Sequence, residues 1–164
     1  MSTNKYEDHI HVLPEDEADS ELASGFLLDH AVAARVIQVL PYAGGWSKVL
    51  DSFEADHIAG MRQFPKRRIV LVLDFDETPN RRQQAENRIP SDLKDRVFLI
   101  GCWTDPQALK RSCSHRPLES IGLDLAEDCR KDTSTAWDHE QLQHNAAELK
   151  RMRQALKPIL FPSV

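Results

Sequence analysis

The sequence predicts an α/β fold, with a central parallel sheet of about four strands flanked by helices and an extra C-terminal helix. Segments with β-forming residues alternate with segments of helical periodicity, which is the order found in layered parallel sheets. The segment Arg68-Ile-Val-Leu-Val-Leu73 is apolar throughout, as expected for a strand that is buried on both faces. A length of 164 residues, with 41% hydrophobic and 29% charged residues, suits one globular domain.

The expected strands are short runs of β-forming residues next to turn-forming residues, and we place them at residues 9–13, 35–40, 68–74 and 96–101. Helices are expected where apolar residues recur at intervals of three and four. The expected helical segments are 21–30, 46–61, a short piece of 78–90, a helix that opens at Asp105-Pro106, 118–129, and about 137–157 with Pro158 as its stop.

Charge is distributed unevenly along the chain. The net charge is −5, and residues 1–60 hold 3 Lys or Arg against 11 Asp or Glu. Residues 61–117 reverse this balance, with 12 basic against 7 acidic residues. An acidic first third beside a basic middle suits metal binding next to an anionic substrate, although solvated surface charge gives the same pattern.

The composition also indicates where in the cell the protein is located. No apolar run approaches the ~20 residues that a membrane helix needs, and the N-terminal residues are polar, so we expect no membrane partner. The three cysteines are an odd number without CxxC spacing. Free thiols in a reducing compartment are therefore expected, which indicates a cytoplasmic location.

Two acidic clusters follow expected strands. In open α/β sheets, sites form beyond the carboxyl ends of the strands. Carboxylates that converge there repel one another unless a cation holds them together, and Mg²⁺ prefers oxygen ligands. Residues i and i+2 of an extended segment point to the same side, so Asp74 and Asp76 can face one ion. As an alternative, the acids cap helices and solubilise strand ends. The clusters are Glu15, Asp16, Glu17 and Asp19 after the first strand, and Asp74, Asp76 and Glu77 after the third.

These segments together resemble a known family, the Toprim domains. The segment Val12-Leu-Pro-Glu15-Asp-Glu-Ala-Asp19 resembles their first motif, a strand that ends in Glu with a second acid four residues later, and Leu71-Val-Leu-Asp74-Phe-Asp76 resembles their DxD motif. Ala43-Gly-Gly-Trp-Ser-Lys48 is similar to the glycine turn of Toprim domains in overcoming-lysogenization-defect nucleases. The resemblance covers about residues 9–115 and leaves a C-terminal helical extension of about 117–164. It departs at Asp16, where the family usually has glycine.

The resemblance implies divalent-metal-dependent phosphodiester chemistry on nucleic acid, as in a Toprim-type nuclease with Mg²⁺ or Mn²⁺ as cofactor. It implies that Glu15 is a metal ligand or general acid/base, and that Asp74 and Asp76 are metal ligands. Asp19 would be an additional ligand for a second ion. The implied substrate-binding residues are Gly44, Gly45 and Lys48, with Lys48 holding a phosphate.

Two kinds of partner are considered. The basic runs Lys66-Arg67-Arg68 and Arg81-Arg82 could follow a nucleic-acid backbone, or they could be solvated surface charge. A second protein subunit, such as a defence-system ATPase, is a further candidate by analogy with multi-subunit relatives of the resembled family.

Two other interpretations stay open. The segment Leu73-Asp74-Phe-Asp76-Glu-Thr78 also matches DxDxT, the first motif of haloacid-dehalogenase-like phosphatases, in which Asp74 would be a nucleophile and Asp76 a general acid. That family normally opens with this strand, whereas two strand–helix units precede it here. The later phosphatase motifs would have to come from Thr104, Lys110, and Asp124 or Asp128.

The third interpretation is a catalytically degenerate Toprim-like module, consistent with Asp16, that binds a partner through its C-terminal helix and the Phe161 tail.

Overall fold

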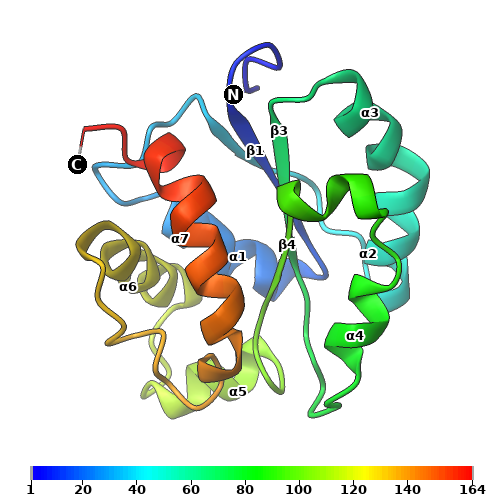
Figure 1. Ribbon diagram of the computed structural model, residues 1–164. Coiled ribbons are helices and arrows are strands. Elements are labelled where there is room, and N and C mark those ends of the chain that lie inside the picture. Colours follow the sequence, from blue (N-terminus) through cyan, green and yellow to red (C-terminus); the bar gives the residue numbers. More distant parts are fainter. Residues whose placement is uncertain (1, 164) are drawn as a thin grey trace.

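The computed structural model describes residues 2–163 and contains one parallel sheet with the strand order β2-β1-β3-β4. The sheet stands between two layers of helices (Figure 1). The predicted α/β fold is therefore confirmed, with all four strands close to their expected positions. They are β1 (His9–Pro14), β2 (Ile37–Val39), β3 (Arg67–Val72) and β4 (Val97–Ile100).

The helices connect the strands and extend beyond them. None of the helices within residues 2–163 is long and apolar enough to cross a membrane. A π-helical turn (Phe53–His57) joins α2 to α3, and short 3₁₀ turns cover Ser91–Arg96 and Gln143–Asn145. The helices are α1 (Glu17–Phe26), α2 (Trp46–Ser52), α3 (Ile58–Gln63), α4 (Arg81–Glu86), α5 (Pro106–Ser112), α6 (Leu118–Lys131) and α7 (Ala146–Leu160).

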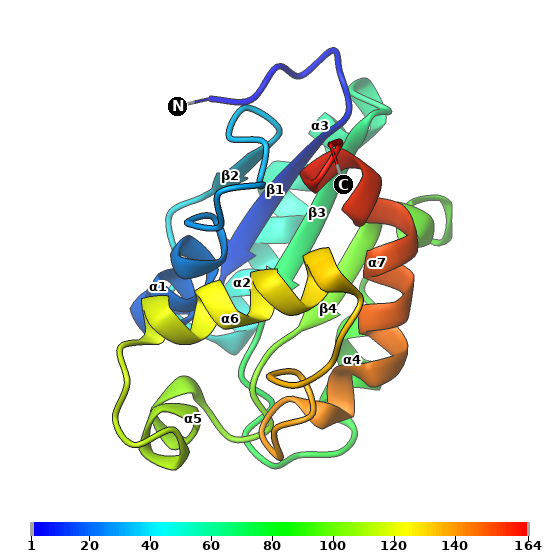
Figure 2. The same cartoon turned by 90° about the vertical axis from the view of Figure 1, so that its left-hand side faces the viewer.

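The alternation of side chains along the central strands divides the core into two halves. In β3, Val70 and Val72 face the layer of α1, α6 and α7, whereas Ile69 and Leu71 face α2 and α3 on the other side. All four side chains are at most 5% exposed. The strand is buried on both faces, which explains why its sequence is apolar without interruption. Figure 2 looks onto the first layer, where α6 and α7 cross the sheet.

Helices α1 and α6 are in unusually close contact. A Cβ atom at Gly25 would lie 2.2 Å from the backbone oxygen of Glu119, and one at Gly122 would lie 2.1 Å from the backbone oxygen of Leu22. No side chain fits at these distances, so the two backbones meet only because glycine occupies both positions. This contact fixes the place of α1 against the C-terminal part of the chain.

Strand β4 is an edge of the sheet, and side chains occupy its free hydrogen-bonding groups. Glu148 accepts from the Leu99 amide at 2.8 Å, and Arg82 donates to the Leu99 carbonyl at 2.7 Å. Asn145 accepts from the Gly101 amide at 3.3 Å and donates to the Gly101 carbonyl at 2.9 Å. We call Arg82, Asn145 and Glu148 the edge network. It satisfies backbone groups that an unprotected edge strand would leave open to pairing.

Two expectations about the C-terminal helices are wrong. The last helix begins at Ala146 rather than near 137, because the carboxylate of Asp128 accepts from the amides of Ala136 and Trp137 and turns this segment back over the end of α6. The helix also continues past Pro158 to Leu160. Pro158 has no N–H and so removes one backbone bond of the last turn, but only two helical residues follow it, and the Phe161 amide closes the turn on the Lys157 carbonyl at 2.8 Å.

Candidate metal centre

Three carboxylates from the two central strands meet at the carboxyl end of the sheet. Glu15 directly follows β1, Asp19 lies in the first turn of α1, and Asp74 follows β3 by two residues. Because β1 and β3 are neighbours, with Pro14 paired to Val72, both strands end at the same edge. One oxygen of each carboxylate lies within 4.8 Å of the others. The structure thus brings together three of the four expected ligands, from two segments 59 residues apart.

Glu15 is held rigidly by its own backbone and by Asp74. Its amide donates to the Val72 carbonyl at 2.9 Å, and its carbonyl accepts from the Gly44 amide at 2.7 Å. Its side chain accepts from the Asp74 amide at 2.7 Å. One oxygen of the carboxylate is therefore fixed in the site, while the other is left for a further contact.

Asp19 is placed by the start of α1. Asp16 is the N-cap and accepts from the Asp19 amide at 3.0 Å. The backbone of Asp16 is extended, with φ −141°, so this position does not require the glycine that the resembled family usually has. The departure at Asp16 thus supplies a helix cap, and the cap holds Asp19 in the first turn.

The carboxylate of Asp19 is fully buried and has no partner. Its exposed fraction is 0%, and neither of its oxygens has a hydrogen bond within the part of the chain that the structure describes. One oxygen of Asp74 is in the same condition. Buried polar atoms are almost always hydrogen-bonded, because an unpaired one costs about 1–3 kcal/mol and an unpaired charge costs more. A proton or a cation between these carboxylates would remove this cost.

Burial and mutual repulsion raise the pKa values of the three acids. The pKa of Asp19 is raised, first by loss of solvent and then by the charge of Asp74. The pKa of Asp74 is raised mainly by burial and also by the charges of Glu15 and Asp16. Burial likewise raises the pKa of Glu15 against the opposing effect of the Asp74 amide. Without a cation, the three acids therefore favour retaining a proton, which a bound cation would displace.

Asp76, the fourth expected ligand, does not join this group. Its side chain is 72% exposed, and its carboxylate lies 3.9 Å from the Arg81 guanidinium. The expectation assumed an extended segment, but β3 ends at Val72, and Asp76 has a left-handed backbone with φ 50°. The rule that residues i and i+2 point to one side no longer applies there, so Asp74 turns inward and Asp76 turns outward.

The glycine turn lies directly against the cluster. The amide of Gly44, at φ 102°, makes the bond to the Glu15 carbonyl described above, and Gly45 precedes α2. Lys48 is exposed, and its side chain lies over Gly44, with Nζ 3.8 Å from the place of a Cβ atom there. The expected substrate-binding residues are therefore next to the acids, and one of them carries a positive charge.

The two expected basic runs have different locations. Arg81 donates to the Asp74 carbonyl at 2.8 Å and lies 4.5 Å over the ring of Trp46. Arg82 is instead committed to the edge network. The run that begins at Lys66 lies at the amino end of β3, away from the acids, where Arg68 pairs with Asp8. Of these two runs, only Arg81 brings positive charge to the site, and nothing in the sequence distinguishes it from Arg82.

The residues of the phosphatase interpretation come together only in part. The hydroxyl of Thr78 donates to the backbone of Asp76, and the carbonyl of Thr104 accepts from the Asp76 amide at 3.2 Å. Buried Asp128 lies elsewhere, where it accepts from Thr133 and from two amides in the segment after α6. Asp74 therefore has Glu15 and Asp19 as its acidic neighbours, rather than the later acids that this interpretation requires.

Comparison of the chain with protein-family models, with curated proteins and with solved structures found no match. The chemistry of the cluster therefore rests on its own geometry.

Proposed function

We propose that Glu15, Asp19 and Asp74 bind a divalent cation, Mg²⁺ or Mn²⁺, and that the chain uses it for phosphodiester chemistry on nucleic acid, in the manner of a Toprim-type nuclease. The observation that carries the proposal is Asp19, a fully buried carboxylate without a partner that faces two further acids. Three oxygen ligands suit a hard cation, which can complete its coordination with water. Soft metals are disfavoured because no thiol or imidazole belongs to the group.

A bound cation supplies charge neutralisation at a phosphate and lowers the pKa of bound water. The residues of the chain add orientation and charge. Glu15 and Asp74 are fixed relative to one another by the bond between the Asp74 amide and the Glu15 side chain. Lys48 and Arg81 lie beside the cluster and can attract an anionic backbone. The Gly44 turn leaves room for a substrate to approach because it carries no side chain.

Metal binding and nucleic-acid cleavage can be tested with one set of variants. Isothermal titration with Mn²⁺ should detect binding to the unaltered chain, and nicking of DNA or RNA should require Mg²⁺ or Mn²⁺. Glu15→Gln and Asp74→Asn should abolish both, because an amide is a poorer ligand and cannot neutralise the charge of the ion. Glu17→Gln is the matched control, since Glu17 is an exposed acid in the same segment.

The outcomes separate the three interpretations. Cleavage of phosphomonoesters that depends on Asp74 but survives Glu15→Gln would replace the nuclease proposal with a phosphatase. Failure to bind Mn²⁺, with no cleavage and with partner binding that persists in EDTA, would favour the interaction module. Asp76→Asn is expected to retain metal binding, and loss of binding in this variant would bring Asp76 into the ligand set.

A further inference from the structure

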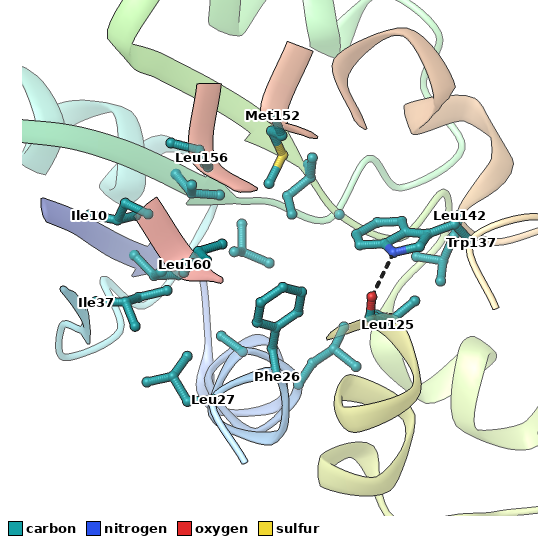
Figure 3. A pocket seen from close by; sticks show the side chains of 17 residues that line it. Ile10, Phe26, Leu27, Ile37, Leu125, Trp137, Leu142, Met152, Leu156 and Leu160 are labelled. Atoms are coloured by element: carbon teal, nitrogen blue, oxygen red, sulfur yellow. Dashed lines mark hydrogen bonds between the residues drawn. The ribbon is translucent and has the colours of Figure 1, made fainter. Parts of the chain in front are cut away.

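A cavity whose chemistry differs from that of the acidic cluster lies between the sheet and the layer of α1, α6 and α7. Its volume is about 80 Å³. Figure 3 shows Ile10 and Ile37 on the strands, Phe26 at the end of α1, and Met152 and Leu156 on α7, all directed toward the same space. The cavity thus draws its lining from all the elements that meet on this side of the sheet.

The lining offers no free hydrogen-bonding group. Every lining residue is aliphatic, aromatic, methionine or glycine. The indole N–H of Trp137 is already bonded to the Leu125 carbonyl at 3.1 Å, as the dashed line in Figure 3 shows. The backbone of Gly101 is bonded to Asn145 through both its amide and its carbonyl. A water molecule needs two to four polar partners, so this cavity excludes water although it is large enough to hold one.

The cavity approaches the surface between α1 and α7. Most of its lining is buried, but Phe26, Leu27 and Met152 are partly exposed. These residues form the part of the lining nearest to solvent, where an apolar group can enter.

We propose that this cavity binds a short, unbranched hydrocarbon group, either a small free molecule or the end of a longer alkyl chain. The apolar lining selects against charged and hydrogen-bonding groups, since these would lose their hydration without compensation. A comparable apolar cavity of about 150 Å³ binds benzene and xenon, so about half that volume corresponds to about three or four carbon atoms. The proposal is independent of the metal centre, which lies at the carboxyl edge of the sheet.

Xenon and a series of straight-chain alcohols test the proposal on the full chain. The methyl NMR signals of Met152, Leu156 and Leu160 should shift saturably with xenon. From ethanol to hexanol, the dissociation constant should fall about fourfold per methylene and level off once the cavity is full. Xenon binding alone would indicate a small free ligand, whereas alcohol binding with the headgroup at the Phe26 opening would indicate the end of a chain.

Two variants change the size of the cavity in opposite directions. Ala23→Leu adds bulk to the lining and should abolish the saturable shifts, whereas Ala155→Leu is the matched control because Ala155 packs on the same core without lining the cavity. Met152→Ala enlarges the cavity, so the dissociation constant should level off at a longer alcohol than in the unaltered chain. If Ala23→Leu does not fold, the result for Met152→Ala still tests the proposal. Shifts that do not saturate, or a levelling point unchanged by Met152→Ala, would overturn the proposal.

Discussion

The molecule contains two buried polar regions of opposite character, the metal centre and the edge network. In the edge network, Asn145 is fully buried and makes bonds to Arg82, Gly101 and Leu142. In the metal centre, Asp19 is equally buried and makes none through its carboxylate. Burial removes water from the polar groups of both regions. Only in the edge network do hydrogen bonds within the described residues replace the lost contacts with water. The difference indicates that the edge network serves stability, and it supports the proposal that the candidate metal centre binds a cation.

The largest expected effect comes from breaking the edge network. Asn145→Ala removes three side-chain bonds, to the amide and the carbonyl of Gly101 and to Arg82, and leaves the buried Gly101 amide without a partner. We expect a loss of about 3 kcal/mol in the free energy of unfolding, measured by urea denaturation. The control is Asn87→Ala, at an exposed asparagine, which should change little. Equal effects of the two substitutions would show that the network is not stabilising.

Addition of a divalent cation should have the next largest effect. A ligand that binds only the folded state at 100 times its dissociation constant stabilises it by about 2.7 kcal/mol. Thermal unfolding with and without Mg²⁺ or Mn²⁺ measures this gain, with Ca²⁺ as a size comparison. A melting temperature that does not respond to any of these ions would contradict a metal centre at Asp19.

Neutralising Asp19 should stabilise the metal-free chain. Asp19→Asn preserves the shape of the side chain and removes one of three close carboxylates, so we expect a gain of about 1–2 kcal/mol in EDTA, as often occurs when a functional site is relieved of repulsion. The same variant should lose the response to Mg²⁺. Glu17→Gln, at an exposed position on α1, should change stability by less than about 0.5 kcal/mol. A destabilised Asp19→Asn would mean that its carboxylate has a structural partner.

The last expected effect is a pH dependence of unusual sign. The folded chain raises the pKa values of Asp19 and Asp74 above the value of about 3.9 in the unfolded chain. The folded state therefore binds more protons than the unfolded state. The contribution of these two acids to stability is complete below about pH 4, and it is lost as the pH rises through their raised pKa values. Denaturant unfolding in EDTA should show this decline, and saturating Mg²⁺ should suppress it. A contribution from this site that increases with pH in EDTA would refute the raised pKa values.

The fold was predictable because it depends on patterns that span whole segments. The uninterrupted apolar run at β3 identified the central strand, and the acids after β1 and β3 could be placed at one edge because parallel strands end together. The inward turn of Asp74 and the outward turn of Asp76 were not predictable. They depend on two left-handed residues, Asp76 and Glu77, whose amides bond to the loop after β4. The edge network was equally hidden, since Arg82 on α4 is 63 residues away from Asn145, its partner in the 3₁₀ turn before α7.

The glycine contact between α1 and α6 has a mechanical consequence. With no side chains between the two backbones at Gly25 and Gly122, neither helix can slide along the other without a steric clash. We therefore expect the two helices to move together, with Asp19 in the first turn of α1 and Phe26 at its other end. A force that tilts α6, for example a partner pressing on its outer face, would then shift Asp19 relative to Asp74.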